Sequence, residues 1–210
     1  MSSINEIRLE FNRSLKIDFN GGDLSSDAGL FLIREFAKKI GIHELIEKQF
    51  KTNDTAQRRH TDAENLLQMI YQKIAGYFRD DDADELTDEP VFRTLLGKEA
   101  LASQPTLSRF HNRMDKDTLD QFNDIQRELR KRIYRYTCPE MLLSYVDSTL
   151  FETFGKQEGE AFNTHYNGHG YHPLLCYDGL TGDLLKAELR SGNVYTSRDV
   201  TDFMEPLLAE

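Results

Sequence analysis

Long apolar runs are missing from the sequence, and cysteine is scarce. No stretch approaches the roughly 18 continuous apolar residues of a membrane span, and the first residues lack the apolar segment of a secretory signal. Cys138 and Cys176 are the only cysteines among 210 residues, and they lack CxxC spacing. This usage argues against a secreted disulfide framework and indicates a reducing compartment with two buried thiols. We therefore expect a soluble, cytoplasmic, globular protein.

Positive charge is also in short supply, since the formal net charge is -10. Nonspecific coating of nucleic acid depends on Lys and Arg releasing condensed counterions, so this balance argues against it. The charge is uneven, however. Residues 79–90 hold seven acids and one arginine, whereas residues 104–136 hold eight basic and five acidic side chains. A local basic face on an acidic protein can still bind DNA.

The patterns predict an α+β chain whose character changes at Cys138-Pro139. Residues 7–19 alternate apolar and polar side chains, which favours a strand pair. Cap residues and helical periodicity then predict a mainly helical region up to residue 138. The expected helices cover residues 25–40 with Ser or Asp caps, 62–78, 90–96, 103–114 and 118–136. The buried positions expected in the first two are Leu30, Ile33, Phe36, Ala37, Ile40, Leu66, Leu67, Ile70, Ile74 and Phe78.

Beyond Pro139 the pattern changes to strands. They are expected over residues 141–147, 171–179 and 184–192, with turn residues in "DGLTGD", followed by a helix that Ser197 caps. Residues 139–210 therefore form a second domain. A three-stranded meander leaves an edge strand unpaired and one face of the sheet only partly covered.

The stretch "LLSYVDSTLFETF" ends a short apolar run on Asp147. An acid at a strand end in solvent is often without function. A carboxylate at the tip of a central strand is also a place where metal-dependent phosphoryl chemistry has its first ligand. The two interpretations both remain open on this stretch alone.

The segment "LLGKEALASQPTLSRFHNRM" permits a helix, a turn and a second helix. We expect Leu107, Phe110 and Met114 to face inward. Arg109, Asn112 and Arg113 then face outward, where they can reach base edges or phosphates of DNA. The alternative is an ordinary exposed helix face, because helical hairpins with surface arginines are common.

The histidines of "HYNGHGYH" suggest a zinc site by their spacing, but weakly. Structural zinc takes four ligands, and His165, His169 and His172 have no cysteine near them in the sequence. Contact with DNA phosphate or simple packing of a glycine-containing loop is preferred.

Several motifs together carry a resemblance to a known family. They are Asp147-Ser148-Thr149, "GYHPLLCY", "TGDLL" and "LRSGN" followed by "SRD", with "AGYFRDDDADELTDEPVF" and "SQPTLSRFHNRM" upstream. In this order they resemble the IS1380-type DDE transposases of bacterial insertion sequences. The similarity runs over essentially the whole chain.

The resemblance implies a ribonuclease-H-like catalytic domain, of which residues 139–210 supply the first three strands and first helix. Asp147 matches the first acid of the Asp-Asp-Glu set, which holds two Mg²⁺ ions for cutting and joining phosphodiesters. The expected partner is double-stranded DNA at terminal inverted repeats, bound by a homo-oligomer in a synaptic complex at the nucleoid. Arg190 and Asn193 match positions of the family. The resemblance implies that Arg190 contacts the DNA backbone, and an ion pair with a nearby acid such as Glu188 is an equal alternative.

The family's second Asp and its Glu have no counterpart before Glu210. The remaining acids are poor substitutes, because Asp178 and Asp183 lie in or beside a turn, while Asp199 and Asp202 suit the helix dipole. We therefore expect a truncated transposase without activity by itself. The alternative is a noncatalytic DNA-binding or oligomerising fragment that modulates an intact transposase.

Overall fold

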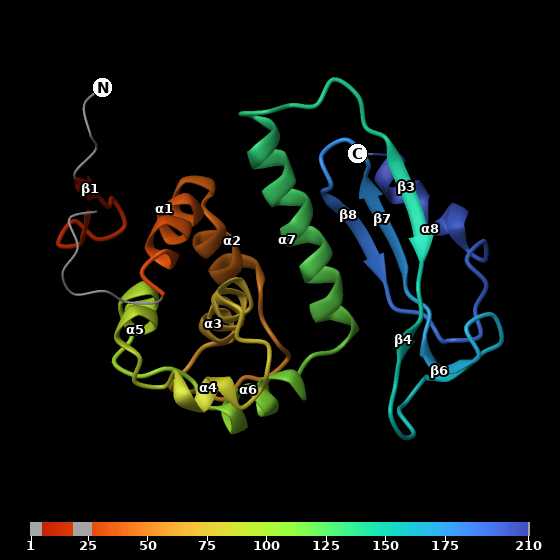
Figure 1. The fold of residues 1–210 in the computed structure, drawn as a ribbon, viewed down its shortest axis with the longest axis horizontal. Coiled ribbons are helices and arrows are strands. Elements are labelled where there is room, and N and C mark those ends of the chain that lie inside the picture. Colours follow the sequence, from red (N-terminus) through yellow and green to blue (C-terminus); the bar gives the residue numbers. More distant parts are fainter. Residues whose placement is uncertain (1–5, 19–26, 210) are drawn as a thin grey trace. The chain divides into compact units, whose positions relative to one another are not determined.

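The computed structural model describes residues 6–18 and 27–209. It divides into two compact units, Met1–Ile133 and Tyr134–Glu210 (Figure 1). The first unit is mainly helical and the second holds most of the strands, so the α+β prediction is confirmed. None of the helices in the described ranges is long and apolar enough to cross a membrane.

The helical unit begins with an antiparallel strand pair, as predicted. Ile7 of one strand pairs with Ile17 of the other, and Phe19 of the predicted pair lies outside the described residues. The elements in chain order are β1 (Glu6–Arg8), β2 (Lys16–Asp18), α1 (Leu30–Ile40), α2 (Ile42–Gln49), α3 (Asp62–Ala75), α4 (Asp82–Glu85), α5 (Pro90–Leu96), α6 (Gln104–His111) and α7 (Lys116–Tyr134).

Helix ends follow local chemistry in several places. Helix α5 starts on Pro90 and ends at Gly97, as predicted. Helix α3 starts with a capping box in which the Thr61 hydroxyl accepts from the Glu64 N–H and the Glu64 carboxylate accepts from the Thr61 N–H, at 3.2 and 2.8 Å. Gly41, at φ 67°, turns α1 directly into α2, a helix that the periodicity did not predict.

Two larger apolar clusters and a small one of Ala83, Ala102 and Leu107 form the core of this unit in the described residues. The first contains Leu45, Ile46, Phe50, Ala63, Leu66, Leu67, Phe110 and Ile125, and the second contains Leu30, Tyr71, Leu86, Phe92, Leu95 and Leu101. The prediction that Ile33, Phe36, Ile74 and Phe78 are buried is wrong, because these side chains are 39 to 69% exposed. Helix α3 ends before Phe78, and α1 buries a narrower stripe than its apolar residues suggest.

The predicted cap of the first helix is wrong for the described part of the chain. The residue before α1 is Gly29, and no side chain caps the helix there. Asp27 instead accepts a hydrogen bond from the hydroxyl of Tyr77 at 3.0 Å. Ser25 and Ser26, the other predicted caps, lie outside the described residues.

A buried histidine makes the stability of this unit depend on pH. The His43 Nε2 lies 2.8 Å from the Tyr71 hydroxyl, and burial lowers the pKa of His43 from 6.5 to about 4, with a further contribution from Arg34. Between these two values the unfolded chain binds a proton that the folded chain does not, so the free energy of unfolding falls as the pH falls.

We expect His43→Gln to remove part of this pH dependence. After a discount for solvent screening, the loss between pH 6.5 and 4 in the wild type is about 2 kcal/mol. Urea unfolding followed by circular dichroism near neutral pH and near the lower end of this window measures it. An unchanged pH dependence in the variant would show that other groups are responsible.

The second unit contains two small antiparallel sheets and a helix. The elements are β3 (Ser144–Ser148), β4 (Phe151–Glu152), β5 (Ala161–Asn163), β6 (Gly168–Tyr171), β7 (Leu174–Asp178), β8 (Leu184–Glu188) and α8 (Val200–Leu208). The strand orders are β3-β7-β8 and β4-β6-β5. The first sheet is the predicted meander, which is visible in Figure 1.

One face of the β3-β7-β8 sheet packs against α8. Leu174, Cys176 and Leu185 form a cluster with Phe203 of the helix. Strand side chains alternate between faces, so Tyr145 and Tyr177 lie on the other face, where they are 59% and 38% exposed. The predicted Ser197 cap is wrong, because α8 begins after Asp199 and no side chain caps it.

The second sheet corrects the prediction of a loop over residues 165–172. Strand β6 occupies Gly168–Tyr171, and β4 and β5 pair with it on either side. A Cβ at Gly170 would collide with the carbonyl group of Phe151, so glycine permits the close approach of these strands.

Two further predictions about single residues can be compared with the structure. Cys176 is buried but Cys138 is exposed, so the expectation of two buried thiols is half wrong. Asp178 is buried at the end of β7, where it accepts hydrogen bonds from Leu143 N, Leu180 N and the Thr181 hydroxyl at 2.8 to 3.2 Å. The hydrogen bond from the Leu143 N–H is the main cause that lowers the pKa of Asp178. The bonds to Asp178 also fasten the start of β3 to the turn after β7.

Candidate functional site

Asp147 lies near the end of β3 and is exposed. It stands opposite Leu175 of β7, and the backbone N–H of Ser148 donates to its Oδ1 at 2.7 Å. Among the described residues β7 is the middle strand of this sheet and β3 is at its edge, which differs from the expected central strand. The carboxylate therefore keeps acceptor capacity at an open edge of the sheet.

Two hollows border Asp147. One, of about 720 Å³, is lined by the ends of β3 and β5, by His165, Tyr166 and His172, and by residues 192–197. The other, of about 600 Å³, lies over the sheet face that carries Tyr145 and Tyr177. Asp147 and Ser148 belong to both linings. The acid can thus be reached from two sides.

The loop after β8 is fixed beside the first hollow by three polar side chains. The Ser148 hydroxyl hydrogen-bonds the Thr196 hydroxyl. His172 Nδ1 lies 2.7 Å from the Val194 carbonyl oxygen. Arg190 donates to the carbonyls of His172, Tyr195 and Arg198 at 3.0 to 3.4 Å. These bonds give the hollow a defined wall.

Arg190 is only 8% exposed, and burial lowers its pKa. Its hydrogen-bond partners are backbone carbonyls, so neither a free DNA-facing guanidinium nor a simple pair with Glu188 describes its position. Asn193, the other predicted residue of this segment, is exposed and lines the first hollow. The two predicted DNA contacts are therefore in different environments.

The three histidines of the predicted weak zinc site are held by other groups, and His165 and His172 both contact the ring of Tyr166. His165 stacks edge-on against Tyr166, and His169 Nδ1 lies 2.9 Å from the Glu160 carboxylate. His172 is engaged with Val194. Over residues 6–18 and 27–209 no group of three His, Cys, Asp or Glu side chains is arranged to hold a metal ion.

In the helical unit, the predicted helix-turn-helix over residues 95–114 corresponds to the end of α5, the segment 97–103 and α6. Arg109 and Asn112 are exposed, as expected. The prediction that Arg113 faces outward is wrong. Its guanidinium lies 2.8 Å from an Asp62 oxygen and 3.4 Å from an Asp54 oxygen, and it covers the ring of Phe110.

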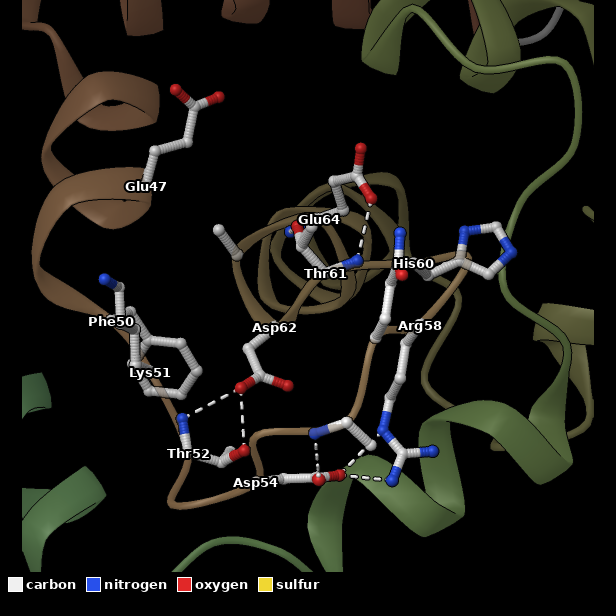
Figure 2. Close-up of a pocket in the computed structure, with 13 residues that line it drawn as sticks. Glu47, Phe50, Lys51, Thr52, Asp54, Arg58, His60, Thr61, Asp62 and Glu64 are labelled. Carbon is white, nitrogen blue, oxygen red and sulfur yellow. Dashed lines mark hydrogen bonds and ion pairs between the residues drawn. The ribbon is translucent and has the colours of Figure 1, made fainter.

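Figure 2 shows the polar pocket around these acids, which the sequence did not indicate. Asp62 accepts from the backbone and hydroxyl of Thr52, and Asp54 pairs with Arg58. Burial favours the neutral form of Asp62, but the bonds from Arg113 and Thr52 outweigh it and lower its pKa. These carboxylates hold the loop before α3 in place.

The family model described as transposase DDE domain group 1 matches residues 7–210. The chain belongs to this family. No curated protein and no solved structure matches it. The prediction of a DDE transposase is thereby confirmed.

DDE transposases typically use divalent metal ions, so the fit of this transposase chain to such ions can be tested. Asp147 offers one carboxylate, but the described ranges contain no set of three ligands around it. Asp178 is committed to backbone N–H groups, and Asp199 and Asp202 lie exposed at the start of α8. The described residues therefore do not form a metal site, and no step of the chemistry is assigned to one.

The strand-end position of Asp147 could be predicted from the sequence, but its surroundings could not. The bond between Ser148 and Thr196 spans 48 positions and has no local signature. The adjacent β4-β6-β5 sheet has strands of two to four residues, which are too short to show a clear alternation. Gly192 was the one residue whose type indicated a close backbone approach, and a Cβ there would collide with the carbonyl oxygens of Ala161 and Gly170.

Proposed function

We propose that this chain is the DNA-binding portion and the first-acid portion of an IS1380-type transposase. That enzyme cuts and joins phosphodiesters at terminal inverted repeats with Mg²⁺, as a homo-oligomer on double-stranded DNA. The observation that carries the proposal is the family match over residues 7–210, joined to the open position of Asp147 at the end of β3. In this proposal the second Asp and the Glu come from outside residues 1–210.

The topology of the second unit supports a ribonuclease-H-like assignment. An antiparallel β3-β7-β8 meander followed by α8 is the order that the proposal needs, and the outer edge of β3 can accept a further strand. Arg109, Asn112 and Asn193 are exposed and suit direct DNA contact. Arg113 and Arg190 instead position neighbouring groups.

A noncatalytic role is the second candidate. The observation in its favour is that no three metal-ligating side chains gather in the described part of the chain. In that case the chain binds terminal-repeat DNA, or associates with an intact transposase, and modulates it without cutting DNA.

Excision from a plasmid that carries the gene with its flanking DNA tests the catalytic proposal. We expect Asp147→Asn to reduce excision to background, because a neutral amide would lack the charge with which Asp147, together with acids from outside residues 1–210, would hold a divalent metal ion. Polymerase chain reaction across the repaired donor site measures the product.

Asp202→Asn is the matched control, since Asp202 is an exposed acid in the first turn of α8. This variant should excise like the wild type. Normal excision by Asp147→Asn would remove Asp147 from the active site. If the wild-type plasmid itself gives no excision, the noncatalytic candidate is favoured.

A further inference from the structure

A second concave surface in the helical unit has an unusual lining. It encloses about 420 Å³ between the loop before α3, the segment before α6 and α6 itself. We call it the arginine pocket; its lining residues include Arg58, Arg59, His60, Asn65, Arg109 and Arg113. None of its twelve lining residues is Asp or Glu, although acids outnumber Lys and Arg by 36 to 26 in the chain. Such a lining repels cations and attracts anions.

The arginines of the pocket are not equivalent. Arg58 and Arg113 are neutralised by Asp54 and Asp62. Arg59 and Arg109 are exposed, and within the described ranges neither has a carboxylate at ion-pairing distance. Two guanidinium groups at the rim are therefore available to a ligand, and guanidinium binds phosphate in a forked geometry.

Asn65 gives the pocket a second, independent feature. It lies on α3, it is 1% exposed, and it lines the pocket. Neither its Nδ2 nor its Oδ1 has a hydrogen-bond partner among the residues described. A buried amide without a partner is costly, so a ligand with oxygen atoms that accepts from Nδ2 explains its presence.

His60 and the hydroxyl groups complete the set of donors. His60 is 9% exposed, and its pKa is lowered first by burial and then by the charges of Lys98 and Arg59. The Ser103 and Thr106 hydroxyls lie 3.2 Å apart at the start of α6 and belong to the same lining. The positive charges of Lys98 and Arg59 therefore act on His60, a residue that lines the pocket.

We infer that the arginine pocket binds a phosphate group of the DNA backbone, with Asn65 at its base and Arg59 and Arg109 at its rim. The inference rests on the proposed function. The same donors would also bind inorganic phosphate, so the choice of DNA follows from the proposed DNA binding. We choose DNA as the source of the phosphate because Arg109 of α6 and Asn112, which directly follows that helix, are exposed and can contact DNA.

Duplex affinity as a function of salt tests the inference. Fluorescence anisotropy is recorded with the full chain and duplex DNA taken from the flanks of the gene. Arg59→Gln should weaken binding about tenfold and reduce the slope of log K against log salt by about one, because one phosphate contact is lost. Arg79→Gln removes the same charge from an exposed side chain outside the pocket and should change neither the affinity beyond about twofold nor the slope.

Asn65→Leu separates a ligand role from a structural one. It should weaken duplex binding by a similar factor while leaving the melting temperature unchanged or higher, because an unpaired buried amide is replaced by an apolar group of similar size. A structural role for Asn65 predicts a lower melting temperature instead, and that result would contradict the inference.

Inorganic phosphate distinguishes the two sources of the ligand. Thermal unfolding of the wild type with phosphate, compared with chloride at equal ionic strength, should show a stabilisation that Asn65→Leu and Arg59→Gln lose. If wild type and both variants bind duplex equally, the inference fails and the proposed function stands. If the wild type binds phosphate but no duplex at low salt, the DNA assignment and the proposed function fail together.

Discussion

Phe110→Ala should lower the free energy of unfolding of the helical unit by about 4 kcal/mol, the largest loss that we expect from any single change discussed. Phe110 is 0% exposed and lies in the cluster with Phe50, whose ring centroid is 6.0 Å away in an edge-on arrangement. Alanine leaves a cavity and also uncovers the guanidinium of Arg113. Urea titration followed at the helical circular dichroism band measures the loss.

Phe78→Ala is the matched control for this prediction. Phe78 is 69% exposed and lies beyond the end of α3, so its removal should change the free energy of unfolding by less than about 0.5 kcal/mol. A large loss for Phe78→Ala, or a loss below about 1 kcal/mol for Phe110→Ala, would show that the core has been placed wrongly.

Arg113→Met should lower the free energy of unfolding by about 2 kcal/mol, because it leaves partly buried carboxylates without their partner. The Arg113 side chain is 15% exposed and Asp62 is 16% exposed, and the pair holds α3 against the end of α6. Methionine keeps most of the apolar stem over Phe110. The same urea titration measures the effect, and it should shrink at low pH as Asp62 becomes protonated.

Arg109→Met, four positions earlier, is the contrasting variant. Arg109 is exposed, and among the described residues its side chain forms only a long contact of 3.4 Å with the Thr106 hydroxyl, so stability should barely change. We expect Arg109→Met to bind duplex DNA more weakly at nearly unchanged stability, whereas Arg113→Met loses stability. Equal stabilities of the two variants would contradict the assignment of Arg113 to the ion-pair network.

These contrasts show which features a sequence can predict. Helix α5 was predicted to the residue because Pro90 and Gly97 act through their own backbone geometry. The position of Asp147 at a strand end was found because a short apolar run marks the strand. Both signals are local, and neither depends on how distant segments pack.

The failures involve distant partners. The helical spacing of Arg113 predicts an outward position. Its partner Asp62, 51 positions away in the sequence, instead attracts it into the unit. Phe78 continues an apolar pattern that Gly76 interrupts at φ 91°. Arg190 is held by carbonyl groups of a loop whose course depends on the unpredicted β4-β6-β5 sheet. Tertiary contacts of this kind override periodicity.

The proposed function makes the chain a DNA-binding protein that contributes one active-site acid. A single gel with end-labelled duplex from the gene's flanks, purified residues 1–210 and Mg²⁺ tests this most directly, because it resolves bound from free DNA and intact from cut strands. We predict a shifted, intact duplex at low salt. A duplex that stays free would contradict the DNA-binding claim, and cut strands that Asp147→Asn abolishes would contradict the claim that the other acids lie elsewhere.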